Sequence, residues 1–349
     1  MTVRTLRSVK DLQAAGLVSD ALAPQLAGVE AAYAIALPES LAGVINRIDL
    51  LDPLRRQYVP SPEEMEVKEG ESGDPIGDVR HSPVPGLVHR YPDRVLIKAA
   101  STCPVYCRFC FRREMVGPEK GEALTKSALD AVIAYIAAHR EIFEVILTGG
   151  DPMMLSAARA REITARLEKI EHVKVIRWHT RMPVTRPDRI TPEYAEAVSS
   201  RTKAVFVSVH ANHANEFTQE AVAACRLLAA QGIALVSQSV LLRGVNDTLE
   251  DLSGLMRAFL SAGIKPYYLH QLDAAPGTSH FRVPVEEGQR LVRALRDTLS
   301  GLAIPHYVFD IAGGVSKASL ALSDVERRDD GWVVRGRDGN LHPLPGQDV

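Results

Sequence analysis

Six short apolar segments alternate with helical patterns through the middle of the chain, and this alternation limits the folds open to it. The apolar segments are VLIKAA (95–100), VILTGG (145–150), VKVIRWH (173–179), AVFVSVH (204–210), ALVSQSVLL (234–242) and KPYYLHQLD (265–273). The helical patterns lie near 125–140, 155–170, 191–200, 215–231, 247–262 and 284–300. Buried strands separated by helices pair in parallel through right-handed crossovers. The sequence therefore predicts an α/β domain, either a partial (β/α)6 barrel or a doubly wound sheet.

Polar and unusual residues gather where these apolar segments end. They are Cys103, Gly149, Gly150, Asp151, His179, His210, Gln238 and Asp273. In both topologies the carboxyl ends of parallel strands form the functional face. We therefore expect a site built from these residues at one edge of the sheet.

The flanking regions differ from the β/α series over 85–303. Residues 1–84 combine helical periodicity with an acidic, glycine-rich connector that begins at Ser61, so we expect a helical N-terminal region and a loop. Residues 304–349 add a seventh short apolar segment, HYVFDIAGG, and a tail with two Asp-Gly pairs around Trp332. Asp-Gly is a strong hairpin signal, so the tail is expected to form a small hairpin.

Charge and composition exclude some classes of partner. The 41 Lys and Arg residues nearly balance the 43 Asp and Glu residues, for a net charge of −2. No global field therefore favours nucleic acid or an anionic membrane. The N-terminus lacks the apolar stretch of a signal peptide, and no 18 apolar residues run together. We expect a cytoplasmic protein that acts on a small molecule.

Three of the four cysteines fall within eight residues, as Cys103-x3-Cys107-x2-Cys110, directly after the first predicted strand. A [4Fe–4S] cluster normally takes four thiolates, so three would leave one iron open to another ligand. A structural zinc site is the alternative, but zinc takes four closed ligands and the nearest further candidate is His89, on the far side of the strand. Cys225 lies on an apolar helix face and is interpreted as an inert core thiol.

This spacing, in a loop after the first strand of a β/α series, resembles the radical SAM superfamily. Seven collinear motifs narrow the resemblance to the lysine 2,3-aminomutase family, over about 85–320. The motifs are HRYPDRVL (89–96), CRFCFRR (107–113), LTGGDPMM (147–154), HANHANE (210–216), QSVLLRGVND (238–247), PYYLHQLD (266–273) and DIAGGVSK (310–317). The resemblance implies a radical SAM partial (β/α)6 barrel and an isomerase that converts L-lysine into β-lysine.

The resemblance also implies three cofactors: a [4Fe–4S] cluster, S-adenosylmethionine (SAM) and pyridoxal phosphate (PLP). It assigns the cluster to Cys103, Cys107 and Cys110, and SAM to Gly149, Gly150, Asp151, His210 and Gln238. It assigns PLP to Lys317, which attaches it covalently, and to Arg90, Tyr91 and Arg94. A primary amine suits this attachment, and the glycines before it let the backbone approach closely. Without the resemblance, Arg90 and Arg94 would be interpreted as a surface basic pair.

Substrate recognition follows from the same resemblance. Arg112 matches the residue that binds the substrate carboxylate, and a guanidinium fork suits a carboxylate. Asp273 and Asp310 match the residues that bind the ε-ammonium of lysine; alone, Asp310 would be interpreted as a turn former. Arg113 either assists or faces solvent.

The match departs from the clostridial-type enzymes, which carry extra C-terminal cysteines that bind zinc at a subunit contact. This tail has none, so we expect no zinc, and a homo-oligomer would form without that contact. The chain length and the GDPIGD connector resemble instead the bacterial branch that makes β-lysine for elongation factor P, whereas Asp310 and the C-terminal hairpin resemble the clostridial type, so the sequence leaves the branch open. Two other hypotheses stay open: the same chemistry on arginine, and a metal-binding scaffold without turnover. An electron donor such as flavodoxin or ferredoxin is implied.

Overall fold

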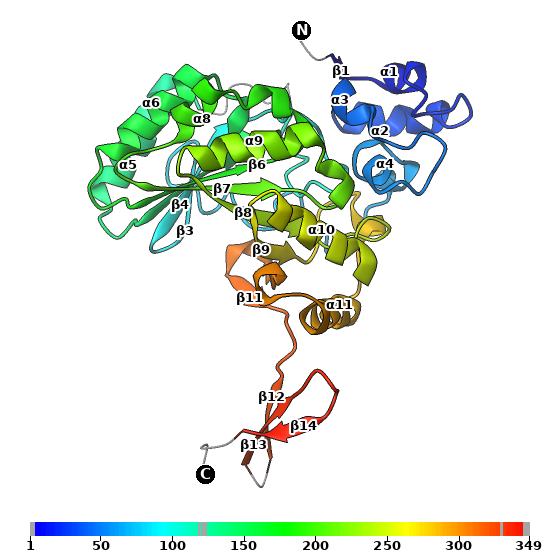
Figure 1. Ribbon diagram of the computed structural model, residues 1–349. Coiled ribbons are helices and arrows are strands. Elements are labelled where there is room, and N and C mark those ends of the chain that lie inside the picture. Colours follow the sequence, from blue (N-terminus) through cyan, green and yellow to red (C-terminus); the bar gives the residue numbers. More distant parts are fainter. Residues whose placement is uncertain (1–3, 118, 120–123, 329–330, 345–349) are drawn as a thin grey trace.

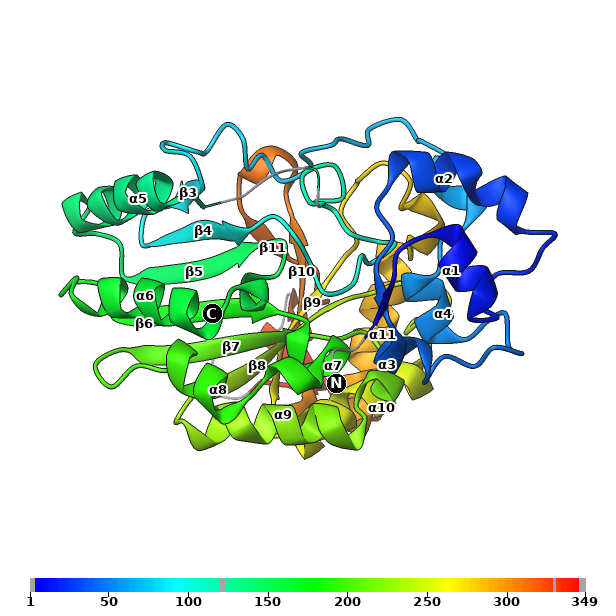
Figure 2. The same ribbon diagram turned by 90° about the horizontal axis from the view of Figure 1, so that it is seen from above.

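The computed structural model describes residues 4–117, 119, 124–328 and 331–344. Its centre is a curled sheet of nine strands in the order β11-β10-β9-β8-β7-β6-β5-β4-β3 (Figure 2). The strands are β3 (Leu87–Tyr91), β4 (Arg94–Ala100), β5 (Glu144–Gly149), β6 (Val175–Thr180), β7 (Ala204–His210), β8 (Ala234–Val240), β9 (Lys265–His270), β10 (His306–Asp310) and β11 (Lys317–Ser319).

Strands β4 to β10 are parallel, and each lies beside the next strand along the chain. The order never reverses, so the doubly wound alternative is wrong and the partial barrel is confirmed. The six expected strands are present, and β10 adds a seventh parallel strand. The antiparallel strands β3 and β11 form the two edges and leave the barrel open.

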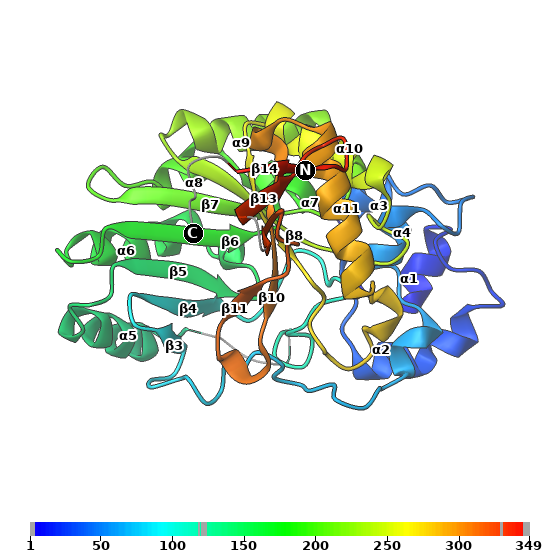
Figure 3. The ribbon, with the colours of Figure 1, turned by 90° about the horizontal axis from the view of Figure 1, so that it is seen from below.

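Helices cover the outer face of the sheet (Figures 2 and 3). They are α5 (Lys126–Ala138), α6 (Ala157–Glu168), α7 (Met182–Thr185), α8 (Pro192–Val198), α9 (Gln219–Ala230), α10 (Leu249–Ser261) and α11 (Val285–Thr298). Several begin after a Ser or Thr whose hydroxyl accepts a backbone N–H, as Thr125, Ser156 and Thr218 do. Cys225 is fully buried between α9 and the sheet, and burial raises the pKa of its thiol to about 12, which confirms an inert core thiol.

The N-terminal region is helical, as expected, although its helices are short. Its elements are β1 (Thr5–Leu6), α1 (Val9–Ala14), α2 (Ala27–Ala32), β2 (Leu37–Pro38), α3 (Glu39–Ala42) and α4 (Pro53–Tyr58). In Figure 2 the arrowheads of β4 and β5 point toward this region. Its apolar core also includes Val105 and contacts Cys107, so it packs directly on the segment that carries the cysteines.

The connector after this region is a loop, as expected, but it starts with a short helical turn and buries two of its acids. Residues Pro62–Met65 form a short 3-10 helix that starts with a capping box between Ser61 and Glu64. Glu64 and Asp78 are both 0% exposed. Buried carboxylates require partners, and the cysteine segment supplies them, as described below.

The C-terminal tail contains one strand more than the expected hairpin. Strands β12 (Val325–Arg328), β13 (Gly331–Arg335) and β14 (Leu341–Pro343) form an antiparallel sheet that projects away from the rest of the molecule (Figure 1). The Asp338-Gly339 pair lies between β13 and β14, as predicted, while Asp330 lies outside the described residues. No helix among the described residues combines the length and apolar character needed to cross a membrane.

Candidate active site

A cavity opens at the carboxyl ends of the parallel strands. Most of the predicted site residues line it, although they come from segments far apart in the sequence. They are Arg90, Cys103, Cys107, Cys110, Arg112, Gly149, Gly150, Asp151, His210, Gln238, Asp273, Asp310 and Lys317. The structure therefore brings the expected cluster, SAM, PLP and substrate residues into one site.

Two predicted residues lie elsewhere. Tyr91 and Arg94 flank the turn between β3 and β4, where the Arg94 guanidinium lies 3.7 Å above the Tyr91 ring and pairs with Asp93 at 2.7 Å. Among the described residues around the cavity, neither contributes to its lining. Their assignment to PLP stays a prediction that depends on the resemblance alone.

The cysteine segment forms one wall of the cavity. Burial raises the pKa of the Cys110 thiol to about 11, and it also raises the pKa values of Cys103 and Cys107. A metal must therefore displace protons from these thiols on binding. Over the described ranges, no three His, Cys, Asp or Glu side chains converge to hold a single metal ion. All three thiols line the same cavity.

Buried acids of the connector hold the cysteine segment in place. Arg108 donates to both carboxylate oxygens of Glu64, at 2.6–3.0 Å, and Arg113 pairs with the same carboxylate. Arg112 donates to Asp78 Oδ2 at 2.9 Å and to Thr148 Oγ1 at 3.1 Å. Arg113 is thus buried, and the alternative that it faces solvent is wrong. These ion pairs hold the segment between the second and third cysteines, and they also hold Arg112, which lines the cavity.

Gly149 and Gly150 place β5 directly against the start of the cysteine segment. Gly149 has φ +113°, and a Cβ there would collide with the carbonyl oxygen of Ala100. A Cβ at Gly150 would collide with the carbonyl oxygen of Thr102. The Gly150 N–H donates to the Ala100 carbonyl at 2.7 Å. Both glycines are therefore required for contact with the protein backbone itself, beside any role toward SAM.

We expect Gly149→Ala to cost on the order of 3 kcal/mol of unfolding free energy, because it combines an unfavourable φ with a collision. Gly263→Ala is the matched control: Gly263 has φ +77° and open space around its Cβ position. Its cost should be roughly 1–2 kcal/mol, from the φ angle alone. Denaturant unfolding of both variants measures the difference. Equal losses of unfolding free energy in the two variants would mean that the collision with Ala100 does not destabilise the protein.

The carboxylate of Asp151 accepts hydrogen bonds from other groups of the protein. Its Oδ1 accepts from the Met153 N–H, both carboxylate oxygens accept from Thr180 Oγ1 at 2.8–2.9 Å, and Oδ2 accepts from the Arg181 N–H. Burial nevertheless raises its pKa. The side chain therefore ties the end of β5 to the end of β6.

A chain of polar contacts crosses the cavity floor from β8 to β11. Gln238 lies 3.2 Å from His270, measured between their Nε2 atoms, and His270 Nδ1 lies 3.3 Å from Asp310. His210, next to Gln238 in the sheet, has a buried Nε2 without a hydrogen-bond partner in the described part of the chain. Burial lowers the pKa of His210 and of His270, so both are neutral at pH 7. An orphaned imidazole in the cavity wall suits contact with a ligand.

Lys317 reaches the cavity from the first position of β11. Its Nζ lies 2.5–2.6 Å from the two carboxylate oxygens of Asp310. Burial lowers the pKa of Lys317. Burial opposes ionisation of Asp310, but hydrogen bonds from His270 and Lys317 outweigh it and hold the Asp310 pKa well below its usual range. A buried amine with a lowered pKa is closer to its nucleophilic neutral form.

The turn before Lys317 needs its glycines. Gly313 and Gly314 have φ angles of +72° and +76°. A Cβ at Gly314 would collide with the Ile76 carbonyl and with the Arg90 side chain. The turn can therefore lie directly against the connector and Arg90.

The pKa of Asp273 shifts in the direction opposite to that of Asp310. Burial and the neighbouring Asp310 raise its pKa to about 7, although Lys317 and Arg112 act in the opposite direction. The Asp310 carboxylate contributes to this rise because two neighbouring carboxylates resist being charged together. This end of the cavity is suited to a cationic group.

Sequence reasoning missed several residues of the cavity and its support. Thr148, Arg181 and His270 line the cavity, and Asp78 supports Arg112. Arg181 follows one of the apolar segments and His270 lies within another, so their positions along the chain could have marked them as site residues. No local signal marks Asp78, whose role depends on a contact with a residue 34 positions away.

A family model, the radical SAM superfamily, matches residues 97–256. The chain is 38% identical to the putative L-lysine 2,3-aminomutase of Aquifex aeolicus over 297 residues, which cover 85% of this chain and 80% of that protein. It is 37% identical to the L-lysine 2,3-aminomutase of Escherichia coli over 290 residues, covering 83% and 84%. The chain belongs to the lysine 2,3-aminomutase family. It is also 38% identical to the Clostridium subterminale enzyme, but its match spans only 66% of that protein's length.

Lysine 2,3-aminomutases are radical SAM isomerases that use a [4Fe–4S] cluster, SAM and PLP, and the residues present fit these groups. Three thiols on one cavity wall suit a cluster with one open iron. The amine of Lys317, in a turn that only glycines permit, suits covalent attachment of PLP. His210 and Gln238, on neighbouring strands between these two walls, suit SAM.

Proposed function

We propose that the protein is an L-lysine 2,3-aminomutase that moves the amino group of L-lysine from C2 to C3 and forms β-lysine. One observation carries the proposal. A single cavity is lined by three thiols, by the amine of Lys317, by Arg112 and by two aspartates. Thiols suit the radical source, the amine suits PLP, and the charged groups match the two ends of lysine.

When bound, SAM and the reduced cluster supply a carbon-centred radical, and PLP carries the amino group while it moves. The chain's own residues bind and orient the substrate. Arg112, held by Asp78 and Thr148, presents its guanidinium to the carboxylate. Fixing this residue from two sides limits its motion, and precise orientation is a large part of catalysis by proximity.

Asp273 and Asp310 bind the distant ammonium of lysine. Lys317 itself illustrates the chemistry, because its own ammonium lies 2.5–2.6 Å from Asp310. A bound side chain without a terminal cation would bring no further positive charge to these two buried carboxylates. Selectivity for a cationic amino acid therefore follows from electrostatics.

We expect Asp273→Asn to lower kcat/KM for L-lysine at pH 8 by roughly 10–100-fold, because a charge-assisted hydrogen bond contributes roughly 1.5–3 kcal/mol. In the unmodified protein, the Asp273 carboxyl takes up a proton below a pH of about 7 and loses its attraction for the ammonium. The value of kcat/KM should then fall about tenfold per pH unit on the acid side.

The measurement is a pH profile of kcat/KM for both proteins. Asp273→Asn should remove the acid limb that this carboxyl causes. Asp130→Asn is the control, because the Asp130 carboxylate pairs with Arg166 on the outer helices and should leave the profile unchanged. An acid limb that persists unaltered in Asp273→Asn would exclude Asp273 from ammonium binding.

The direct test of the function is an anaerobic assay. The protein is loaded with iron, sulfide and PLP, given SAM and a reductant, and offered L-lysine or L-arginine in separate reactions. Formation of β-lysine, followed by chromatography, supports the proposal. If 5′-deoxyadenosine forms and only arginine is converted, the substrate assignment is wrong. If the loaded protein forms neither product, the proposed function is wrong.

We also propose that a small electron carrier such as flavodoxin or ferredoxin reduces the cluster, and that the protein works in the cytoplasm. Support comes from the three thiols, which must stay reduced to bind iron, as they do in that compartment.

A further inference from the structure

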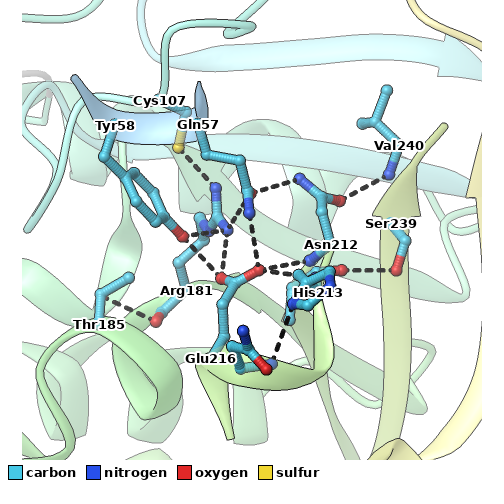
Figure 4. A network of polar contacts seen from close by, with 12 residues as sticks. Gln57, Tyr58, Cys107, Arg181, Thr185, Asn212, His213, Glu216, Ser239 and Val240 are labelled. Carbon is cyan, nitrogen blue, oxygen red and sulfur yellow. Dashed lines mark hydrogen bonds and ion pairs between the residues drawn. The ribbon is translucent and has the colours of Figure 1, made fainter. Parts of the chain in front are cut away.

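A buried network of polar side chains joins four distant segments beside the cysteines (Figure 4). Its centre is Arg181, the residue directly after β6, whose side chain is only 8% exposed. The Arg181 Nη1 atom donates a hydrogen bond to Cys107 Sγ at 2.8 Å. A cationic donor is thus aimed at the sulfur of one predicted cluster ligand.

The other terminal nitrogen of Arg181 is held by three acceptors. Nη2 lies 2.6 Å from Glu216 Oε2, 2.6 Å from the Tyr58 hydroxyl and 3.2 Å from Gln57 Oε1. The Nη2 atom alone would be enough to pair with the Glu216 carboxylate. The contact with sulfur comes in addition, and the three acceptors determine which way Nη1 points.

The residues that hold Arg181 are themselves fixed. The Tyr58 hydroxyl donates to Glu216 Oε2 at 2.6 Å, and Glu216 Oε1 accepts the backbone N–H groups of Asn212 at 2.7 Å and His213 at 3.0 Å. The Asn212 amide donates to Gln57 Oε1 at 3.0 Å. Gln57, Glu216 and Asn212 are 0% exposed. Arg181 Nε has no partner among the described residues, but its Nη2 is held by three hydrogen-bonded acceptors in a low-dielectric interior, and these hold the arginine in one position.

We propose that Arg181 is a positioning residue for the iron–sulfur cluster, donating a hydrogen bond to the Cys107 sulfur and raising the reduction potential of the cluster. One-electron reduction adds negative charge that spreads onto the ligand sulfurs. A cationic N–H donor therefore stabilises the reduced form more than the oxidised form. Hydrogen bonds to sulfur are among the levers that set these potentials. The inference rests on the proposed function, because Cys107 must be a cluster ligand.

The same network gives α4 a role in this reaction. Gln57 and Tyr58 belong to the N-terminal region, and their contacts with Arg181 and Glu216 span more than 120 residues of sequence. The N-terminal region therefore reaches the cluster site through one arginine.

The test is a redox titration of the iron-loaded protein without SAM, followed by electron paramagnetic resonance of the reduced cluster. Omitting SAM removes any contact between Arg181 and that ligand. We expect Arg181→Gln to lower the potential by about 59 mV, which is a tenfold drop in the ratio of reduced to oxidised cluster at the midpoint of the unmodified protein. Arg181→Lys keeps the positive charge and should give a smaller shift of the same sign.

Arg177→Gln is the matched control on the same strand. Arg177 pairs with Glu144, the first residue of β5, at the end of the sheet opposite the cysteines. Its replacement should lower the unfolding temperature and leave the potential unchanged. If iron-loaded Arg181→Gln has the potential of the unmodified protein, the proposal is wrong, and Arg181 only stabilises the fold.

Tyr58→Phe decides the question if Arg181 variants fail to fold or take up iron. It removes one acceptor from Arg181 without changing any charge, and a smaller negative shift supports the proposal, whereas an unchanged potential overturns it. Failure of the proposed function has a different signature. The unmodified protein would then form no β-lysine in the anaerobic assay, whereas failure of this inference leaves its lysine turnover intact.

Discussion

Replacing Lys317 with alanine is expected to lower lysine turnover by at least about a thousandfold, the scale on which removal of a catalytic group acts. Lys317 is the amine that faces the cavity from the glycine turn, with its Nζ on Asp310 and its pKa lowered by burial. Without it, PLP loses its covalent attachment. Asp310 also loses the cation that it pairs with in the free protein.

Activity and attachment can be measured separately. Borohydride should fix PLP onto the unmodified protein, and mass spectrometry should find the added mass on the peptide that contains Lys317. Lys265→Ala is the matched control, since Lys265 begins β9 at the far end of the sheet and donates to the carbonyls of Pro266 and Ile304. It should retain both PLP and turnover. Recovery of PLP on another lysine in the unmodified protein would contradict the assignment.

Replacing Cys110 with alanine is expected to abolish turnover and to remove the iron–sulfur cluster, the second of the two largest effects. Two thiolates would then remain for a cube that needs three protein ligands to leave one iron open for SAM. The fold should survive, because Arg108 and Arg113 keep their ion pairs with Glu64 on either side of the substitution.

Iron and sulfide content, together with the absorption of the anaerobically loaded protein, measure this loss. Cys225→Ala is the control, because Cys225 is fully buried in α9 and lies in the helix-covered core rather than the cavity wall. It should bind iron and turn over lysine as the unmodified protein does. A Cys110→Ala protein that keeps a full complement of iron would exclude this cysteine as a ligand.

Much of the fold could be read from local pattern. The six apolar segments became β4 to β9, and helices formed near each expected position, because burial on both faces gives strands a continuous apolar sequence. The choice between partial barrel and doubly wound sheet needed the structure. Both have the same alternation of strands and helices along the chain, and they differ only in which strands pair.

The residues of the candidate site also differ in how far the sequence could predict them. The spacing of Cys103, Cys107 and Cys110 points to their chemistry, whereas Lys317 was assigned through the family resemblance; all four line the cavity. Tyr91 and Arg94 were assigned to PLP by the resemblance alone; they stack on each other beside the turn between β3 and β4, and their assignment stays a prediction. A motif transfers a residue's position along the chain, but it does not transfer the direction of its side chain.

The sequence by itself therefore determined the β/α architecture and the identity of the reactive groups, because periodicity and thiol spacing are local properties of the chain. Tertiary structure alone decided the electrostatics. Glu64 and Asp78 become buried partners of the cysteine segment, Asp273 and Asp310 acquire opposite pKa shifts, and Arg181 reaches a sulfur. Charge interactions depend on burial and on distances between residues far apart in sequence, and only the folded chain defines these.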